Sequence, residues 1–248
     1  MKFIGQAAKT AFYYKKDFND WPNWDLIYKI KCKSTEYELN KYLNRLKNDF
    51  ARPVAIVANE QFSGVGQNGR KWYSPPGGIW LSAAYPIFNN KFLPEIFSLS
   101  LANQLCDMFL DKSIKVCLKW PNDIFYGSRK IIGFLPKVIT RGNEILYVRV
   151  GIGINLNNKT PIEGISLSEI IKRKNLCEYQ WTAKILKVIV KAVQCNSNKM
   201  EVIKKANIFL NKEFLPKGHN PNLWSIKHID WNGNLIMFNK FNEKVLKI

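Results

Sequence analysis

The chain has 248 residues and a mass of 28.8 kDa, which allows one large domain or a medium domain with a small appendage. Hydrophobic residues make up 46% of it and aromatic residues 13%, so the composition excludes a globally disordered chain. Lysine and arginine outnumber aspartate and glutamate by 38 to 19, which gives a net charge of +19. This excess indicates either an acidic partner, such as nucleic acid, an anionic membrane or an acidic protein, or only a compositional preference for lysine.

The sequence carries no sign of a membrane or secretory protein. No apolar run approaches the roughly 20 residues that a membrane-spanning helix requires, and no apolar stretch follows the first charged residue. The five cysteines are scattered without a C-x-x-C pair, which predicts neither a zinc site nor a disulfide framework. We therefore expect a cytoplasmic protein without a membrane partner.

The first part of the chain predicts an irregular arm, a strand and a helix. Residues 1–22 are polar and aromatic without a clear period and predict the arm. Residues 26–32 alternate apolar and polar side chains, as a half-buried strand does. Apolar residues then recur at helical spacing between Leu39 and Leu46, and Thr35 with Glu38 predicts a capping box at the start of this helix.

The rest of the chain predicts alternating strands and helices that end in a small β appendage. In chain order, we expect strands at 53–58 and 79–85, a helix at 94–111, a strand at 114–119, a hairpin of strands at 130–139 and 144–156, helices within 182–211 broken near 196–198, and strands at 223–229 and 234–238.

A glycine-rich segment follows the second strand. Residues 64–69 match the dinucleotide fingerprint G-x-G-x-x-G, but the prolines at 75 and 76 exclude the helix that this fingerprint must open. We therefore predict a long, mobile, cationic loop between two strands, in which Arg70 and Lys71 supply charge for a phosphate or carboxylate. A surface excursion without a ligand is the alternative.

A second segment with candidate chemistry is Lys119-Trp120-Pro121-Asn122-Asp123, which directly follows a predicted strand. Asp123 could bind Mg²⁺ or accept a proton, and Lys119 and Lys130 could neutralise a polyphosphate. Taken alone, Pro121-Asn122-Asp123 is more typical of an ordinary turn than of a site. The functional interpretation is favoured because the sequence also contains the glycine-rich segment and a further turn at 151–155.

Together these motifs resemble those of the biotin–protein ligases, in a short form without an N-terminal DNA-binding domain. The similarity runs from about Leu26 to Glu169 and is carried by Ser34-Thr35-Glu36, Gln61–Gly78, Lys119–Asp123 with Arg129–Gly133, Val150–Asn155 and Ile165–Leu167. The chain departs from the family pattern at Val65 and Gln67, where arginines are usual, and at Glu36, where asparagine is usual. The departures at 65 and 67 predict a weaker hold on a phosphate.

The resemblance implies an α+β fold. Its core would be a catalytic domain with a mixed sheet, like that of the class II aminoacyl-tRNA synthetases, followed by a small SH3-like β domain. We expect an N-terminal arm at 1–25, the catalytic domain at 26–212 and the small C-terminal β domain at 213–248.

The resemblance also implies the activity: activation of biotin by ATP as biotinyl-5′-AMP, with Mg²⁺, and transfer to a lysine of the biotin carboxyl carrier protein of acetyl-CoA carboxylase. The expected catalytic residues are Lys130, Asp123 and Arg70, and Asp123 is also the expected metal ligand. The expected biotin-binding residues are Ser34, Thr35, Gln61, Gly64, Trp72, Lys130, Gly133, Gly151 and Gly153. The expected ATP-binding residues are Arg70, Trp72, Lys119, Asn122 and Asn155.

Two other functions stay open at this point. A lipoate or octanoate transferase shares the expected fold, but its signature with a paired His and Asp is absent from the sequence. A nucleic-acid-binding protein would account for the charge, and it would need a coherent basic face with exposed aromatic residues. We expect no specific DNA binding, and a homodimer is left open.

Overall fold

The computed structural model describes residues 6–18, 22–47, 50–88 and 91–248. The chain divides into two compact units. Unit 1 comprises Met1–Asn89 and Arg129–Lys187, and unit 2 comprises Asn90–Ser128 and Val188–Ile248. The predicted domain boundaries at 25 and 212 stay predictions.

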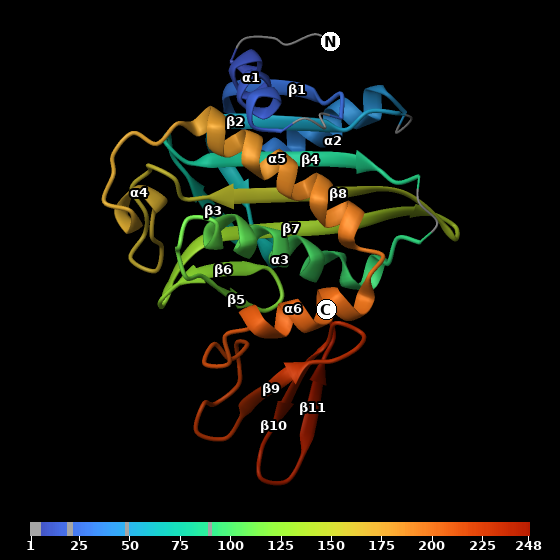
Figure 1. Cartoon of the computed structure of the whole chain (residues 1–248), viewed down its shortest axis with the longest axis vertical. Helices are drawn as coiled ribbons and strands as arrows, with labels where there is room; N and C mark the ends of the chain where they lie inside the picture. The colour runs from blue at the N-terminus through green and yellow to red at the C-terminus, as the bar shows by residue number, and fades with distance from the viewer. Residues whose placement is uncertain (1–5, 19–21, 48–49, 89–90) are drawn as a thin grey trace. The chain divides into compact units, whose positions relative to one another are not determined.

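Unit 1 is built on a mixed β-sheet (Figure 1). In spatial order its strands are β1 (Asp25–Cys32), β2 (Val54–Val65), β4 (Ile79–Pro86), β8 (Glu144–Ile154) and β7 (Arg129–Arg141), and β3 (Lys71–Ser74) pairs with β2. The β1–β2 pair is parallel, whereas β2–β4, β4–β8 and β7–β8 are antiparallel. The strands predicted at 26–32, 53–58, 79–85, 130–139 and 144–156 are confirmed, and β2 continues seven residues beyond its predicted end.

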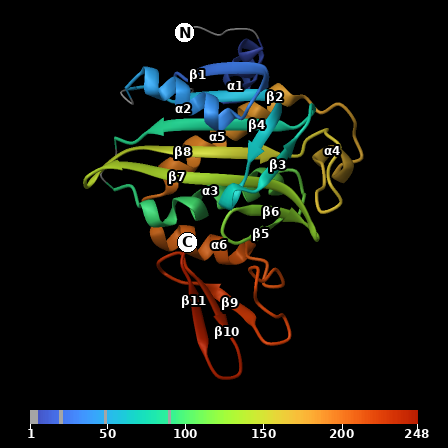
Figure 2. The ribbon, with the colours of Figure 1, turned by 180° about the vertical axis from the view of Figure 1, so that it is seen from behind.

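Helices cover both faces of this sheet. Figures 1 and 2 show α2 (Thr35–Arg45) on one face, and on the other α1 (Ala7–Asp17) together with the part of α5 (Glu178–Cys195) that belongs to unit 1. This arrangement explains why β4 is buried along almost its whole length, with only Tyr85 half-buried. Its sequence accordingly lacks the alternation of a strand with one wet face.

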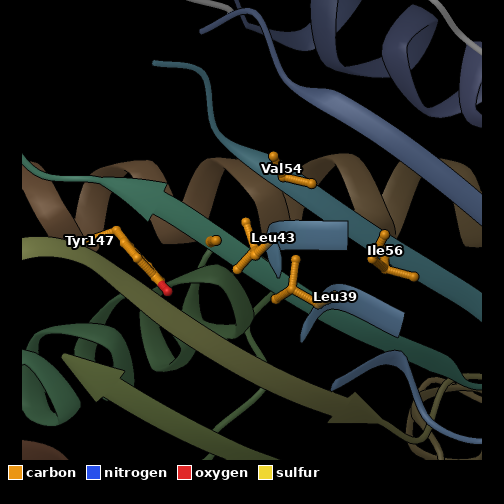
Figure 3. Packing of buried hydrophobic residues seen from close by; sticks show 6 residues of the cluster. Leu39, Leu43, Val54, Ile56 and Tyr147 are labelled. Carbon is orange, nitrogen blue, oxygen red and sulfur yellow. The ribbon is translucent and has the colours of Figure 1, made fainter. Parts of the chain in front are cut away.

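The face under α2 contains a compact hydrophobic cluster. Leu39 and Leu43, four residues apart on the helix, pack on Val54 and Ile56 of β2 and on Tyr147 of β8 (Figure 3). Both leucines are fully buried. The helical spacing of apolar residues that predicted this helix is therefore the spacing of its contacts with the sheet.

The N-terminal segment corrects one expectation. Instead of an irregular arm, residues 7–17 form α1, and its buried residues are Ala7, Thr10, Ala11 and Tyr14. Their spacing of i, i+3, i+4 and i+7 is helical, but small residues and a threonine carry it, so the apolar pattern in the sequence was weak. The remaining parts of the predicted arm, residues 1–5 and 19–21, lie outside the described residues.

The glycine-rich segment is a second correction. The predicted mobile loop is largely a β-hairpin, in which Gly64 of β2 pairs with Trp72 of β3 and Val65 pairs with Lys71. A short 3-10 turn, η1 (Gln67–Gly69), closes the hairpin. Only two residues on each strand carry this pairing beyond Gln61, so the strand signal in the sequence was too short to detect.

Unit 2 contains helices and two small antiparallel arrangements of strands. The predicted helix at 94–111 is confirmed as η2 (Pro94–Ile96) followed by α3 (Phe97–Leu110), and α6 (Lys199–Phe209) packs beside α3. The predicted helix break is confirmed at Asn198, whose side chain caps α6 by accepting a hydrogen bond from the Glu201 backbone N–H.

Strands form the rest of unit 2. The predicted strand at 114–119 is shorter, β5 (Cys117–Lys119), and pairs with β6 (Asp123–Tyr126), which the sequence analysis missed. The C-terminal sheet has the order β11 (Glu243–Leu246), β10 (Leu235–Phe238) and β9 (Ser225–Ile229). Its two predicted strands are confirmed, and β11 is an addition.

The predicted α+β fold, with a mixed sheet and a small C-terminal β-sheet, is confirmed. Within the described ranges, no helix is long and apolar enough to cross a membrane.

The hydrophobic cluster under α2 gives a stability prediction. Leu43→Ala removes a fully buried side chain and should lower the free energy of unfolding by about 2–5 kcal/mol, because the lost contacts leave a cavity. Asn44→Ala, at the exposed next position of the same helix, should change it by less than about 0.5 kcal/mol. Urea unfolding followed by circular dichroism measures both values. Equal effects of the two substitutions would contradict the packing described for α2.

Candidate active site

A chain of hydrogen bonds joins four polar side chains where α2 begins on the sheet. Gln61 Oε1 accepts from the Thr35 backbone N–H at 2.7 Å and from Thr35 Oγ1 at 3.1 Å. Thr35 Oγ1 also lies 2.9 Å from Ser82 Oγ, and Gln61 Nε2 donates to Ser74 Oγ at 2.8 Å. Ser74 Oγ in turn donates to the Trp72 carbonyl at 3.1 Å. We call Thr35, Gln61, Ser74 and Ser82 the hydroxyl–amide cluster.

The start of α2 corrects the predicted capping box. Ser34, not Thr35, is the N-cap, and its Oγ accepts a hydrogen bond from the Tyr37 backbone N–H at 3.1 Å. Thr35 is the first helical residue, and its hydroxyl belongs to the hydroxyl–amide cluster. A capping box requires Ser or Thr at the last non-helical position, and the helix begins one residue earlier than the box at Thr35 assumed. Ser34 therefore caps the helix, and its expected contact with biotin stays a prediction.

Gly64 is the position where the hairpin allows this cluster to form. A Cβ atom at Gly64 would lie 2.6 Å from both Ser74 Oγ and the Trp72 carbonyl oxygen, and 3.0 Å from Gln61 Nε2. Any larger residue would push apart the groups that make the hydrogen bonds. The expected site residues Thr35, Gln61 and Gly64 are thus brought together.

The sheet beside this cluster carries no side chains at three positions. Gly133 of β7 lies opposite Gly153 of β8, and Gly151 lies opposite Ser82 of β4. Opposed residues, and residues two apart on a strand, face the same side of a sheet. Gly133, Gly151 and Gly153 therefore form one bare strip, the glycine strip, on the same face as Ser82 of the hydroxyl–amide cluster.

Trp72 and Lys130 lie on the glycine strip. A Cβ atom at Gly153 would be 2.5 Å from Trp72 Nε1, and one at Gly133 would be 2.9 Å from Trp72 Cζ3 and 3.0 Å from Lys130 Nζ. The ammonium of Lys130 is 4.6 Å from the centroid of the Trp72 ring, a cation–π contact. The indole N–H of Trp72 is buried and has no hydrogen-bond partner among the described residues. Leaving such a donor without a partner costs free energy.

The backbone of Lys130 is fixed from two sides. Its N–H donates to the Glu163 carbonyl at 2.8 Å, and its carbonyl accepts from the Ile165 N–H at 3.0 Å and from Asn155 Nδ2 at 3.2 Å. Asn155 Oδ1 accepts from Asn158 Nδ2 at 3.0 Å. Asn155 therefore positions Lys130, a role that the sequence analysis did not assign. Its expected contact with a nucleotide stays a prediction.

Arg70 lies apart from these groups. It is exposed at the turn of the hairpin, where its Nε donates to the Gln67 carbonyl at 3.2 Å. Val65 and Gln67, which stand where arginines were expected, are also exposed. The hairpin turn thus carries one arginine whose guanidinium is held by the turn itself, and the predicted role of Arg70 toward a phosphate stays a prediction.

The other expected nucleotide residues belong to unit 2. Lys119 and Asp123 are paired in the β5–β6 hairpin, and Asn122 is buried in the turn between them. The ammonium of Lys119 lies 5.1 Å from the Phe125 ring centroid and 5.5 Å from that of Phe214. In the part of the chain that the structure describes, no three His, Cys, Asp or Glu side chains are grouped closely enough to hold a metal ion. The expected metal ligand Asp123 stays a prediction.

Cysteine chemistry is unfavourable beside the hydroxyl–amide cluster. Cys32 of β1 pairs with Gln61 and is buried. Burial, with a smaller contribution from the charge of Glu38, raises the pKa of the Cys32 thiol to about 11. The thiol therefore stays protonated at neutral pH and does not provide a thiolate nucleophile.

Two cluster members, Ser74 and Ser82, were missed by the sequence analysis. Signals for both were present. Ser74 lies between Trp72 and Pro75 in the Gln61–Gly78 motif, and Ser82 is the one hydroxyl in the apolar run of residues 79–84. A polar residue inside a buried strand needs a hydrogen-bond partner, and that requirement could have identified Ser82.

Comparisons with known proteins match this chain to one protein family. A family model described as the biotin/lipoate A/B protein ligase family matches residues 28–155. The bifunctional ligase/repressor BirA of Bacillus spizizenii is 29% identical over 137 residues, which are 54% of this chain and 41% of that protein. The biotin–[acetyl-CoA-carboxylase] ligase of Paracoccus denitrificans is 30% identical over 104 residues, 41% of this chain and 43% of that protein. The matches thus span about two fifths of these curated relatives.

Solved structures show the same fold over most of the chain. The biotin protein ligase of Aquifex aeolicus in complex with biotin and ATP superimposes with a TM-score of 0.69 at 24% identity, covering 90% of this chain and 96% of that chain. A mutant of the Aquifex aeolicus protein, in complex with biotin, gives a TM-score of 0.65 at 26% identity, with 90% of this chain and 95% of that chain covered.

The glycine strip provides a matched pair of substitutions. Gly153→Ala should displace the Trp72 indole, because its Cβ would lie 2.5 Å from Nε1, and should cost about 1–3 kcal/mol of stability. Gly151→Ala places a Cβ no closer than 3.8 Å to any neighbour and should leave both the position of the Trp72 indole and the stability unchanged. Urea unfolding gives the stability, and the indole N–H resonance that Trp72→Phe removes reports the displacement. A shift of this resonance in both variants, or in neither, would contradict the contact.

Proposed function

Because the chain belongs to the biotin/lipoate A/B protein ligase family, we propose that it is an ATP-dependent ligase that activates biotin as biotinyl-5′-AMP and transfers it to a lysine of a biotin carboxyl carrier protein. One observation carries this proposal. The glycine strip, with Lys130 and the buried indole N–H of Trp72 upon it, shares a sheet face with the hydroxyl–amide cluster. A ligand with a polar ring at one end and a carboxylate at the other matches this arrangement.

The proposed role of the hydroxyl–amide cluster is to bind the ureido ring of biotin. A buried urea left without partners costs a few kcal/mol, so its site must provide both donors and acceptors. Thr35 and Gln61 provide them within one network, in which Thr35 is buried. The indole of Trp72, which lies on the main chain of Gly153, offers the apolar wall that the rest of the biotin molecule needs.

In the first step, an oxygen of the biotin carboxylate attacks the α-phosphorus of ATP. A carboxyl–phosphate bond forms, the bond from the α-phosphorus to the bridging oxygen breaks, and pyrophosphate leaves. Negative charge builds on the phosphate during the attack, so a cation held in place beforehand lowers the barrier. We assign this role to Lys130, whose backbone is anchored by Asn155 and by the segment 163–165. Arg70, Lys119 and Asn122 are the further proposed contacts of ATP.

In the second step, the amine of the acceptor lysine attacks the acyl carbon of the adenylate and AMP leaves. The amine must lose a proton, because its ammonium form is not a nucleophile. Asp123 is the proposed acceptor of this proton or, in the alternative, an organiser of Mg²⁺. Mg²⁺ usually binds through one or two protein carboxylates and the phosphates of its substrate, so a single aspartate fits it, and the ion would neutralise phosphate charge.

The partners and the location follow from the same proposal. The acceptor is proposed to be the carrier protein of acetyl-CoA carboxylase, the enzyme after which the Paracoccus denitrificans relative is named. A net charge of +19 would raise the rate of encounter with an acidic carrier domain. All five cysteines are free thiols, which fits a reducing cytoplasm.

Lipoate is the other substrate in the name of the family. Its dithiolane ring has no N–H or C=O group to pair with Thr35 and Gln61. Binding it would leave the polar groups of the cluster without a ligand partner, which favours biotin.

Lys130→Ala tests the first step. Pyrophosphate exchange that depends on biotin should fall by about 10²–10³-fold, because the charge acts mainly in the transition state. Lys174→Ala, which removes an exposed lysine of unit 1, should keep the wild-type rate and controls for the loss of one positive charge. Circular dichroism of both variants verifies the fold. Near-normal exchange by a folded Lys130→Ala protein would contradict the role of Lys130.

A further inference from the structure

We propose that Ser74 and Ser82 are positioning residues that set the choice of ring, by holding Gln61 and Thr35 in the one orientation that complements a cyclic urea. This inference rests on the proposed function and deepens it. Neither serine needs to touch the ligand. Each acts through a neighbour in the hydroxyl–amide cluster, in which Ser74, Ser82 and Thr35 are all buried.

The orientation of the Gln61 amide follows from a donor that cannot reverse. The Thr35 backbone N–H lies 2.7 Å from one atom of that amide, which must therefore be the carbonyl oxygen. The NH₂ group then points to Ser74 Oγ, 2.8 Å away, which must accept. Ser74 is able to accept because its own proton goes to the Trp72 carbonyl at 3.1 Å. Ser74 thus fixes the amine side of Gln61, as Thr35 fixes the oxygen side.

Ser82 fixes the hydroxyl of Thr35 in the same way. If Thr35 Oγ1 donates to Gln61 Oε1 at 3.1 Å, its single proton is used, and the 2.9 Å contact with Ser82 is then a donation from Ser82. The donors run in one direction, from Ser82 to Thr35 to Gln61. With this assignment each hydroxyl proton of the cluster is used in a hydrogen bond within the protein.

What remains for a ligand is defined by these assignments. Gln61 Nε2 has a second N–H, and the hydroxyl oxygens keep lone pairs that accept. A cyclic urea presents one carbonyl acceptor and two N–H donors, which match this set. A dithiolane ring matches none of it. Without Ser74, Thr35 still fixes the oxygen of the Gln61 amide, but the NH₂ group loses the acceptor that sets the plane of the amide. Its second N–H is then no longer held toward the ligand, so discrimination would fall.

Ser74→Ala tests the inference by steady-state pyrophosphate exchange with the full chain. KM for biotin should rise about ten- to a hundredfold, as is typical when a residue that orients a ligand-binding group is lost. KM for ATP and kcat should stay within about twofold, a split that a general loss of structure would not give. Ser63→Ala, in the same hairpin and outside the cluster, is the matched control and should behave as the wild type.

A double-mutant cycle shows whether Ser74 acts through Gln61. Adding Ser74→Ala to Gln61→Ala should change KM for biotin by less than about twofold, because the group that Ser74 orients is already absent. Ser82→Ala, on β4 instead of the hairpin, should raise KM for biotin several-fold with kcat unchanged. If Ser74→Ala does not fold, the Ser82→Ala variant still tests the inference.

Three results would overturn the inference while leaving the proposed function intact. The first is a wild-type KM for biotin in both serine variants. The second is a fall in kcat together with a rise in KM for both biotin and ATP. The third is full additivity of Ser74→Ala with Gln61→Ala. Wild-type protein without any exchange in the presence of biotin would instead overturn the proposed function, and the inference with it.

Discussion

The site depends on the absence of side chains at two facing positions of the sheet. Gly133 and Gly153 lie opposite each other on β7 and β8, and a Cβ atom at either would come within 3.0 Å of Trp72 or Lys130. Two large side chains, one cationic and one aromatic, can therefore lie against main chain. The ammonium and the indole N–H are held on a rigid surface, and that is the condition for a site that must stabilise charge without reorganising.

One face of the sheet carries both the hydrophobic cluster under α2 and the hydroxyl–amide cluster. Under α2 it is a conventional hydrophobic interface, with Leu39 and Leu43 packed on β2 and β8. Where α2 begins, apolar contacts give way to the hydroxyl–amide cluster, which Thr35 links to the helix. The helix cap at Ser34 decides where this change occurs, because it fixes which hydroxyl faces the sheet. The first turn of α2 thus contributes to the proposed biotin site, and the following turns pack on the sheet and stabilise the fold.

Elements with strong periodicity could be predicted from the sequence. So could several of the residues that the structure brings together, among them Thr35, Gln61, Trp72 and Lys130. The long strands and the helix of Leu39 and Leu43 have clear patterns. The helix at 7–17 was missed because its buried positions include small residues and Thr10, and the β2–β3 hairpin because its pairing is short. Motifs identify residue types, but they do not give the direction of a hydrogen bond. The exchange of roles between Ser34 and Thr35 therefore needed the three-dimensional structure.

The measurement that tests this account most directly is a crystal structure of the protein with biotin. The account predicts that the ureido ring lies within hydrogen-bond distance of Thr35 and Gln61, that the ring system contacts the Trp72 indole where it lies on the glycine strip, and that the carboxylate points to Lys130. A ring bound elsewhere, without contact to the hydroxyl–amide cluster, would contradict it.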